Sequence, residues 1–328
     1  MSFFPKVLVI GIGSIGARHV NNLLNLGYGN ITLVTRRKDF SKDWPELTVF
    51  ESLESALAQG EFTHAVISSP TSRHITDLNL VLKAGIKYVF LEKPLSHSWE
   101  NVDEVIQQIS PEHKISLGFD LRFDPGLMKV QELIRSGVIG PVFSAVAFVG
   151  QYLPDWRPHE DYRLGSSAKI SAGGGVLLDL VHEFDYLHWL LGKAKMIGAF
   201  YQNSHSLEIE TEDLADVLIK FESGAQATVH LDYLQKKLVR YCHLTGAGGI
   251  IRWDLAQRMV CITKINGEEK TWDFSQHERN DRFVKIIKAF IENTQEENLA
   301  SLPDGLSSLK MVLAAKKSSE TSTFVHLS

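Results

Sequence analysis

The stretch VLVIGIGSIG at residues 7–16 determines the first part of the fold. Val7–Ile12 is a continuous apolar run, which is typical of a strand buried on both faces of a parallel sheet. A G-x-G-x-x-G pattern occupies residues 11–16, and helical spacing follows from Ser14 to Leu26. A glycine pattern after a strand and at the start of a helix predicts a β-α-β unit with a phosphate-binding turn.

Each glycine of this turn has its own use. Gly11 permits the tight turn, Gly13 lets the backbone approach a pyrophosphate, and Gly16 lets the helix pack closely on the strand. Ser14 and Ile15 lie in the first turn of the helix, where unpaired N–H groups and the helix dipole favour phosphate. The alternative is a glycine-rich turn that binds no ligand.

The end of the second strand indicates which dinucleotide this turn would hold. An NAD site usually has Asp or Glu about 20 residues after the glycines, bonded to the ribose. No acidic residue occurs between Gly16 and Asp39, and Thr35, Arg36 and Arg37 occupy the expected position. A hydroxyl and guanidinium groups suit the 2′-phosphate of NADP. We therefore expect NADP to be preferred over NAD, unless the arginines belong to a solvated surface loop.

Strand and helix signals alternate over the first 120 residues. Further strands are expected at Ile31–Thr35, Thr48–Phe50, His64–Ser68, Tyr88–Leu91 and Ile115–Phe119, and helices at Ser52–Gln59, Thr71–Ala84 and Ser98–Ile109. This alternation predicts a parallel sheet with helices on both faces. Residues 1–120 are therefore expected to form an α/β domain that binds NAD(P).

The pattern changes after Asp120. Helices are expected at Pro125–Ser136, Gly175–Leu191, Arg279–Glu292 and Gly305–Ser318, and strands at Val142–Phe148, Asp216–Phe221, Ala225–Leu231 and Val239–Leu244. Consecutive strands with short turns favour antiparallel pairing. Residues 121–328 are therefore expected to form an α+β domain with a mainly antiparallel sheet.

Lys93 is the first candidate for proton transfer. It lies in Glu92-Lys93-Pro94, directly after the expected strand Tyr88–Leu91, and α/β sheets bind ligands at the carboxyl ends of their strands. A lysine there can bond a substrate hydroxyl. Pro94 fixes the turn and permits a cis peptide bond before it. An ordinary surface turn is the alternative.

The expected helix Gly175–Leu191 carries the second set of candidates. At 100° per residue one stripe contains Asp179, His182, Asp185 and Trp189, and the opposite side contains Leu180, Phe184, Leu187 and Leu191. The apolar side would pack on the sheet, and the polar side would present an acid and an imidazole to a cleft. A structural histidine is the alternative.

These motifs together resemble the Gfo/Idh/MocA oxidoreductase family. The resemblance rests on the glycine turn, on Glu92-Lys93-Pro94 and on the glycine-rich helix with Asp179 and His182. It implies a Rossmann domain, a second domain with a large open sheet, and hydride transfer at a sugar, cyclitol or nucleotide-sugar carbon. Family members commonly place the acid four residues before the histidine, whereas the spacing here is three.

Other residues gain a role from the resemblance. It implies a cofactor site that includes Ser69, Pro70, His74, Glu92 and Lys93, and a substrate site that includes Lys93, Arg122, Asp179 and His182. The segment 153–163 is similar to a loop in one branch of the family, which often appears with cell-surface sugar biosynthesis. Its Trp156, Tyr162 and Arg163 would stack on and bond a sugar or its anionic group, and a subunit contact is the alternative.

We expect an NAD(P)-dependent dehydrogenase or reductase whose catalytic residues are Lys93, Asp179 and His182. In oxidation His182 would accept the hydroxyl proton, Asp179 would orient the substrate or the imidazole, and Lys93 would bond the reacting oxygen. Lys93 as the principal proton relay is a variant of this mechanism. The alternative function is a non-catalytic NAD(P)-sensing regulator on the same fold.

Composition excludes several other functions. The 328 residues include 34 Lys and Arg and 39 Asp and Glu, a net charge of −5, which gives no global attraction to nucleic acid. Cys242 and Cys261 are too few for a disulfide framework or a zinc motif, so we expect no metal and a reducing cytoplasmic location. No apolar stretch reaches the roughly 18 residues of a membrane span.

We expect a small carbohydrate as ligand. We also expect a homodimer or homotetramer formed through the second sheet, since an exposed apolar face is costly.

Overall fold

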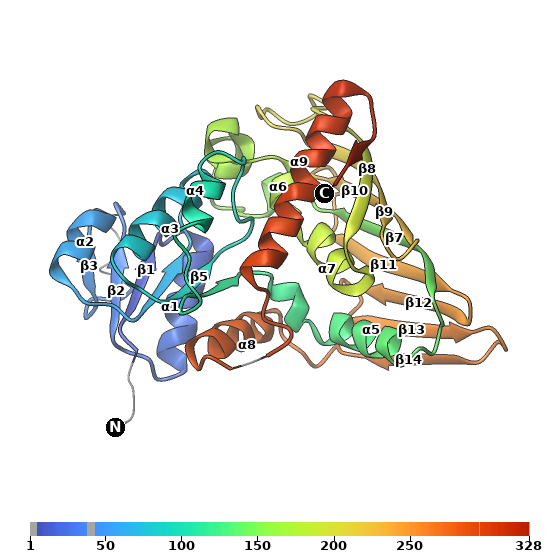
Figure 1. Cartoon of the computed structure of the whole chain (residues 1–328), viewed down its shortest axis with the longest axis horizontal. Coiled ribbons are helices and arrows are strands. Elements are labelled where there is room, and N and C mark those ends of the chain that lie inside the picture. Colours follow the sequence, from blue (N-terminus) through green and yellow to red (C-terminus); the bar gives the residue numbers. More distant parts are fainter. Residues whose placement is uncertain (1–4, 38–42, 295, 328) are drawn as a thin grey trace. The chain divides into compact units, whose positions relative to one another are not determined.

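The computed structural model describes residues 5–37, 43–294 and 296–327, and the chain divides into two units (Figure 1). Unit 1 contains the described residues up to Asp120 together with Arg279–Gly305. Unit 2 contains Leu121–Glu278 and the described residues from Leu306 onward. The first change of unit lies where the sequence pattern changes, but the return of residues 279–305 to unit 1 differs from the expected single domain 121–328.

Six parallel strands form the sheet of unit 1, in the order β3-β2-β1-β4-β5-β6. They are β1 Val7–Ile10, β2 Ile31–Val34, β3 Thr48–Phe50, β4 His64–Ile67, β5 Tyr88–Leu91 and β6 Lys114–Leu117. Every residue of β1 and of β4 is buried, as strands covered on both faces must be. The strand order reverses between β1 and β4, which is where sheets of this kind bind their ligands.

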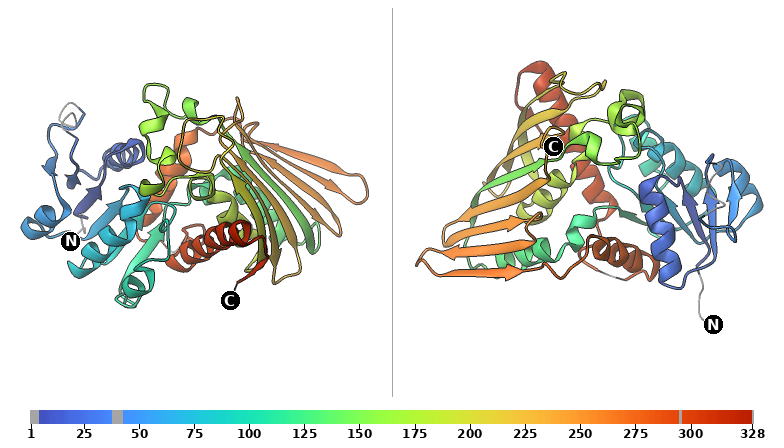
Figure 2. Two further views of the ribbon diagram at one scale, coloured as in Figure 1. Left: turned by 90° about the horizontal axis from the view of Figure 1, so that it is seen from above. Right: turned by 180° about the vertical axis from the view of Figure 1, so that it is seen from behind.

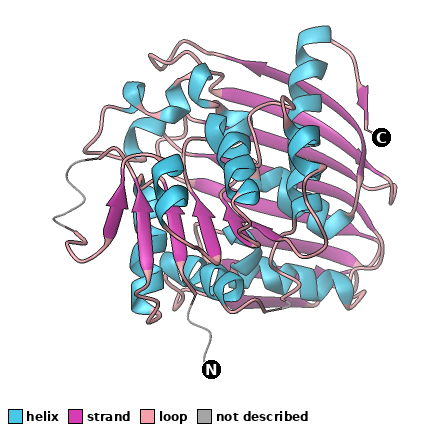
Figure 3. Ribbon diagram, turned by 60° about the vertical axis from the view of Figure 1, so that its left-hand side comes forward, coloured by secondary structure: helices cyan, strands magenta, loops and turns pink. Residues whose placement is uncertain are grey.

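Helices flank the sheet of unit 1 (Figure 3). They are α1 Ser14–Asn25, α2 Leu53–Gln59, α3 His74–Lys83, α4 Val102–Ile106 and α8 Arg279–Ile291. The position of α8 explains the late return of the chain. Asn280 donates to Asn22 on α1 at 2.9 Å, and the Arg18 guanidinium lies 4.6 Å from the centre of the Phe283 ring. Ser301 then bridges to Ser116 at the end of the sheet.

Nine strands form the sheet of unit 2, in the order β14-β13-β12-β11-β7-β10-β9-β8-β15. They are β7 Val142–Gly150, β8 Ala194–Gln202, β9 Leu214–Phe221, β10 Gln226–Asp232, β11 Val239–Gly246, β12 Gly249–Asp254, β13 Met259–Lys264, β14 Glu269–Asp273 and β15 Val325–His326. Only β7 and β10 pair in parallel, and every other pair is antiparallel. The mainly antiparallel second sheet expected from the sequence is confirmed.

The helices of unit 2 lie against one face of this sheet (Figure 2). They include α5 Pro125–Arg135, α7 His182–Leu191 and most of α9 Leu302–Thr321. Side chains along these strands alternate between the two faces of the sheet. On the helix-covered face Val217, Val229 and Cys242 are fully buried. On the open face Val146, Phe200 and Leu218 are 42%, 75% and 52% exposed. Cys242 and Cys261 are both free thiols.

The expected helix Gly175–Leu191 is two helices in the structure. The first is α6 Val176–Asp179, and α7 begins at His182 after Leu180 leaves helical geometry at φ −98° and ψ 31°. No proline or glycine lies at this break. The break arises because the side chains on its two sides are bonded to different elements of unit 2. Among the described residues, no helix combines the length and the apolar composition that crossing a bilayer needs.

Candidate active site

The glycine turn between β1 and α1 has the geometry that a pyrophosphate site needs. Gly11 has φ +84°, and a Cβ on Gly16 would lie 2.1 Å from the carbonyl oxygen of Gly11. A Cβ on Gly13 would meet nothing within 4 Å among the described residues, so ligand atoms can approach the backbone there. Gly13 is the N-cap of α1 and has no side chain that could bond the N–H groups of Ser14 and Ile15. These residues fit a dinucleotide phosphate.

The end of β2 carries the residues that would distinguish NADP from NAD. Thr35 is buried, and its hydroxyl accepts a hydrogen bond from the backbone N–H of Arg37 at 3.0 Å. The Arg37 guanidinium donates to the carbonyl oxygen of Ile12 at 3.0 Å, which places it against the glycine turn. Arg36 is exposed. The structure therefore brings the basic segment and the glycine turn together.

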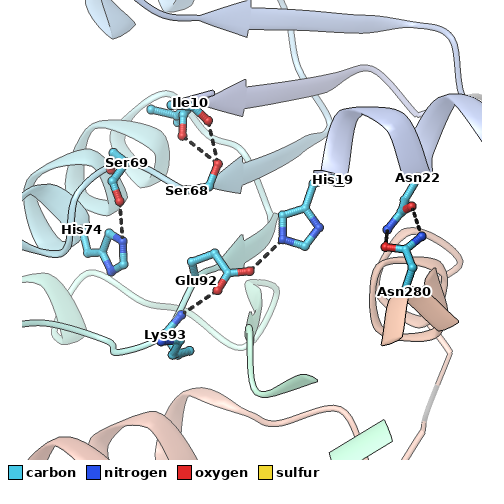
Figure 4. Close-up of polar contacts among 10 residues, drawn as sticks. Ile10, His19, Asn22, Ser68, Ser69, His74, Glu92, Lys93 and Asn280 are labelled. Atoms are coloured by element: carbon cyan, nitrogen blue, oxygen red, sulfur yellow. Dashed lines mark hydrogen bonds and ion pairs between the residues drawn. The ribbon is translucent and has the colours of Figure 1, made fainter. Parts of the chain in front are cut away.

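Glu92 and Lys93 follow β5 and are fixed by a buried histidine (Figure 4). His19 Nε2 lies 2.7 Å from Oε1 of Glu92, and Oε2 of Glu92 accepts from the backbone N–H of Lys93 at 3.2 Å. A Cβ on Gly118 would lie 2.6 Å from Oε2 of Glu92, so glycine is needed at this position of unit 1. Lys93 itself is half-buried, and its peptide bond to Pro94 is cis, as the sequence permitted.

His74 joins the loop after β4 to the loop after β5, and Figure 4 shows its contact with Ser69. Its Nδ1 lies 2.7 Å from the carbonyl oxygen of Pro94, and its Nε2 lies 2.9 Å from that of Ser69. Burial lowers the pKa of His74, although both carbonyls favour its protonated form. Ser69 also donates to Asp77 at 2.6 Å. His74 therefore holds the backbone of both loops, and Pro70 in the loop after β4 is exposed.

The glycines before α6 make room for a buried carboxylate. Gly175 has φ +111°, and a Cβ on it would lie 2.4 Å from Oε1 of Glu212. A Cβ on Gly174 would lie 2.3 Å from the carbonyl oxygen of Ser166. Burial raises the pKa of Glu212, while Lys316, 3.4 Å away, acts in the opposite direction. The glycine-rich approach seen in the sequence is therefore a packing requirement of unit 2.

Asp179 and His182 lie on either side of the break between α6 and α7. Asp179 is half-buried, and Tyr233 at the end of β10 donates to its Oδ2 at 2.7 Å. His182 is 7% exposed, so it is much more buried than a side chain on an open helix face. Because the helix is interrupted, the expected stripe does not continue from Asp179 to the residues of α7.

The polar side of α7 is occupied by two buried ion pairs. Arg122 donates to both oxygens of Asp185 at 2.9 and 2.7 Å, and its guanidinium lies 5.6 Å from the ring of Trp189. Arg240 on β11 donates to both oxygens of Glu183 at 2.7 Å. Arg122 is 2% exposed. The structure thus places Arg122 in the packing of α7, and its expected role in substrate binding stays a prediction.

The loop after β7 supplies a pocket within unit 2. Trp156 and Tyr162 line it together with Leu153, Gly165 and Ser167. Arg163 is not among the residues that line this pocket. Its guanidinium donates to both oxygens of Asp161 and to one oxygen of Glu208. These carboxylates raise the pKa of Arg163 above its usual value.

Sequence reasoning did not find His19, Tyr233 or Glu212. His19 had a local signal, because it lies three residues after Gly16 on the same face of α1. Tyr233 had a weaker one, its position just after a strand. Glu212 had no local signal, because its place in the site depends on the glycine that its carboxylate contacts in space.

The fold and these groups define an NAD-binding oxidoreductase, and comparison with known families agrees. The model for an oxidoreductase family with an NAD-binding Rossmann fold matches residues 5–119, and the model for the GFO/IDH/MocA C-terminal domain matches residues 127–252. The chain belongs to the Gfo/Idh/MocA oxidoreductase family.

Similar proteins include myo-inositol 2-dehydrogenase from Thermotoga maritima, which is 26% identical over 98% of both chains. Scyllo-inositol dehydrogenase from Lactobacillus casei, solved with NAD(H) and scyllo-inositol, is 20% identical with a TM-score of 0.80 over 99% of both chains. An oxidoreductase from Agrobacterium radiobacter, solved with NAD+, L-tartaric acid and magnesium, is 17% identical with a TM-score of 0.82, covering 99% of this chain and 98% of that one. These two structures establish the shared fold.

Proposed function

We propose that this protein transfers hydride between a nicotinamide dinucleotide and an alcohol carbon of a cyclic polyol or sugar. The observation that carries the proposal is the fixed position of Lys93. It lies two residues after the end of β5, its N–H donates to the Glu92 carboxylate, and the carbonyl of the next residue, Pro94, lies against His74. A lysine held at the carboxyl end of a dinucleotide-binding sheet is well suited to bond the oxygen of a reacting alcohol.

We assign the proton chemistry to His182, Asp179 and Lys93. In oxidation, His182 accepts the proton of the substrate hydroxyl, Lys93 bonds the same oxygen, and Asp179 orients the hydroxyl or the imidazole. The nicotinamide, when bound, supplies the hydride acceptor. The alcohol thereby loses a proton and a hydride and becomes a ketone. In a variant of this mechanism Lys93 is the principal proton carrier.

The substrate class rests on the relatives and on the pocket of unit 2. Curated relatives are named as inositol dehydrogenases, so we propose a carbohydrate-like polyol for this chain. Trp156 and Tyr162 line the pocket, and aromatic rings provide an apolar surface with a polar edge that suits a sugar ring. Arg122 is given a positioning role through Asp185 in place of direct contact.

We further propose that NADP is preferred over NAD. Arg36 is exposed and Arg37 is held beside the glycine turn, where guanidinium groups can bond a 2′-phosphate. In this proposal Thr35 shapes the turn by bonding the Arg37 backbone, and Ser69 and Pro70 complete the cofactor site.

The open face of the sheet in unit 2 is proposed to pair with a second copy of the chain. Phe200, Leu218 and Val146 are exposed there, and Phe148 stacks between His230 and Tyr241 on the same face. Exposed apolar side chains on one face of a sheet are costly in a monomer.

A panel of cyclic polyols and sugars, each incubated with the protein and NADP+ or NAD+, tests the proposed function. Appearance of reduced nicotinamide with at least one polyol is the expected result. The proposal would be contradicted if the protein bound the dinucleotide tightly but neither oxidised nor reduced it with any polyol or sugar of the panel. That result would favour the alternative function, a non-catalytic NAD(P)-sensing regulator.

A further inference from the structure

Tyr233 is a rigidly held residue that the sequence motifs do not include. It directly follows β10, and its side chain is fully buried. Its backbone N–H donates to the carbonyl oxygen of Asp213 at 2.9 Å, and its carbonyl oxygen accepts from Leu153 at 3.0 Å. Trp156 contacts the ring edge-on, with centroids 5.3 Å apart. The phenol oxygen is therefore fixed in unit 2 before any ligand binds.

The hydroxyl of Tyr233 has a charged partner on α6. Its Oη lies 2.7 Å from Oδ2 of Asp179. Burial first, and then Asp179, raise the pKa of Tyr233 well above its usual value, so the group remains a neutral phenol at working pH. A neutral phenol facing a carboxylate donates its proton, and hydrogen bonds to charged groups are among the strongest in proteins. The Tyr233 hydroxyl thus fixes the Oδ2 side of the Asp179 carboxylate.

The elements on each side of this bond are fixed without it. After Tyr233, Oδ1 of Asp232 accepts from the N–H groups of Leu234 at 2.6 Å and Gln235 at 2.8 Å. At the start of α6, the N–H of Val176 donates to the carbonyl oxygen of Glu212 at 3.0 Å. Loss of the Tyr233 hydroxyl would therefore remove a contact that holds the Asp179 side chain while both backbones stay in place.

We propose that Tyr233 is a positioning residue that fixes the rotamer of Asp179 for hydride transfer. The inference rests on the proposed function, because Asp179 has a catalytic role only there. A carboxylate that rotates away from its reacting position costs rate, since orientation accounts for much of a catalytic group's effect. Tyr233 acts through Asp179 and not on the substrate.

The kinetic test uses Tyr233→Phe, Asp179→Ala and the double variant, with Tyr186→Phe as matched control. Tyr186 is also fully buried in unit 2, where its ring packs edge-on against Trp253. Tyr233→Phe is expected to lower kcat by about 10- to 100-fold with a smaller change in KM. In the Asp179→Ala background the same substitution is expected to change kcat by less than about twofold. Wild-type kcat in Tyr233→Phe, or an equal loss in both backgrounds, would overturn the proposal.

A double-mutant cycle of urea unfolding separates this inference from the proposed function. It uses the wild type, Tyr233→Phe, Asp179→Ala and the double variant. The urea midpoints of the two single variants and the double variant should be non-additive, because either single substitution removes the same bond. Additive midpoints would show that Tyr233 does not hold Asp179, whatever the enzyme does. If the wild-type protein turns over no polyol, the proposed function and the positioning role of Tyr233 in hydride transfer both fail, and the cycle still decides whether Tyr233 holds Asp179.

Discussion

Nε2 of His19 lies 2.7 Å from Oε1 of Glu92, and His19 is fully buried. His19 belongs to α1, the helix that begins at the glycine turn, and Glu92 immediately precedes Lys93. One hydrogen bond therefore joins α1 to the residue directly before Lys93, which is the residue proposed to bond the reacting oxygen. The edge-on contact of the His19 ring with Phe90, at 5.1 Å, fixes the imidazole from a second side.

Substitution of His19 by Leu tests the structural weight of this bond. It leaves Oε1 of Glu92 buried without its donor, which is expected to lower the free energy of unfolding by about 1–3 kcal/mol. Urea denaturation measures the change, and Glu92→Gln, which retains an acceptor oxygen, should lose less. A His19→Leu protein as stable as the wild type would contradict this account.

Lys93→Met removes the ammonium group and keeps much of the side-chain length. Turnover is expected to fall by about 100-fold or more, because a positioned proton-transfer group contributes that much, while the dissociation constant of the dinucleotide stays unchanged. Lys87→Met is the matched control, because Lys87 belongs to the same unit, is exposed and is paired with Glu112. Steady-state kinetics and fluorescence titration of the dinucleotide give both quantities. Full activity of Lys93→Met would refute the mechanism.

The proposed cofactor preference depends on two arginines. Arg36→Ala and Arg37→Ala are each expected to weaken NADPH binding by about tenfold and NADH binding much less, because only NADPH carries the 2′-phosphate. Added salt should weaken NADPH more than NADH in the wild type, since exposed charge pairs are screened. Lys83→Ala, an exposed lysine of the same unit, serves as control. Equal losses for both dinucleotides would point to a solvated loop with no role in selection.

His230 on the open face of the second sheet makes stability depend on pH. Asp232, with Oδ2 3.0 Å from Nε2, and Asp216, with Oδ1 2.7 Å from Nδ1, raise the pKa of His230 above 6.5. A raised pKa means that the folded protein holds this proton more tightly. The stabilisation is therefore complete below about pH 6.5 and is lost as pH rises through the folded-state pKa.

The substitution His230→Gln should accordingly lower the urea midpoint more at about pH 5.5 than at about pH 9. Phe148, which stacks on His230 at 4.5 Å, has no titratable group of its own, so the pH dependence comes from the imidazole. The same midpoint difference at the two pH values would show that the proton on His230 carries none of the stability.

Local patterns were sufficient to predict the sheet of unit 1 and the residues at its carboxyl edge. The burial of β1 follows from four apolar residues in succession, and Gly11, Gly13 and Gly16 mark the turn by spacing alone. The antiparallel sheet of unit 2 follows in the same way, because alternating strands with short turns report on neighbours in the chain.

The differences arise where distant contacts decide. The break after Asp179 lies in an apolar run that favours a continuous helix, yet Tyr233 bonds one side and Arg122 and Arg240 bond the other. The return of α8 to unit 1 depends on Asn280 meeting Asn22, which are 258 residues apart in the sequence. Neither contact leaves a signal in the local pattern.

Direct hydride transfer is the central claim, and isotopic labelling measures it. The active polyol, deuterated at its reacting carbon, is incubated with the protein and the oxidised dinucleotide, and the products are analysed by mass spectrometry. The account predicts that the deuterium appears on the reduced nicotinamide and that the carbon becomes a ketone. Reduced nicotinamide without deuterium, or recovery of the intact dinucleotide with the polyol unchanged, would contradict it.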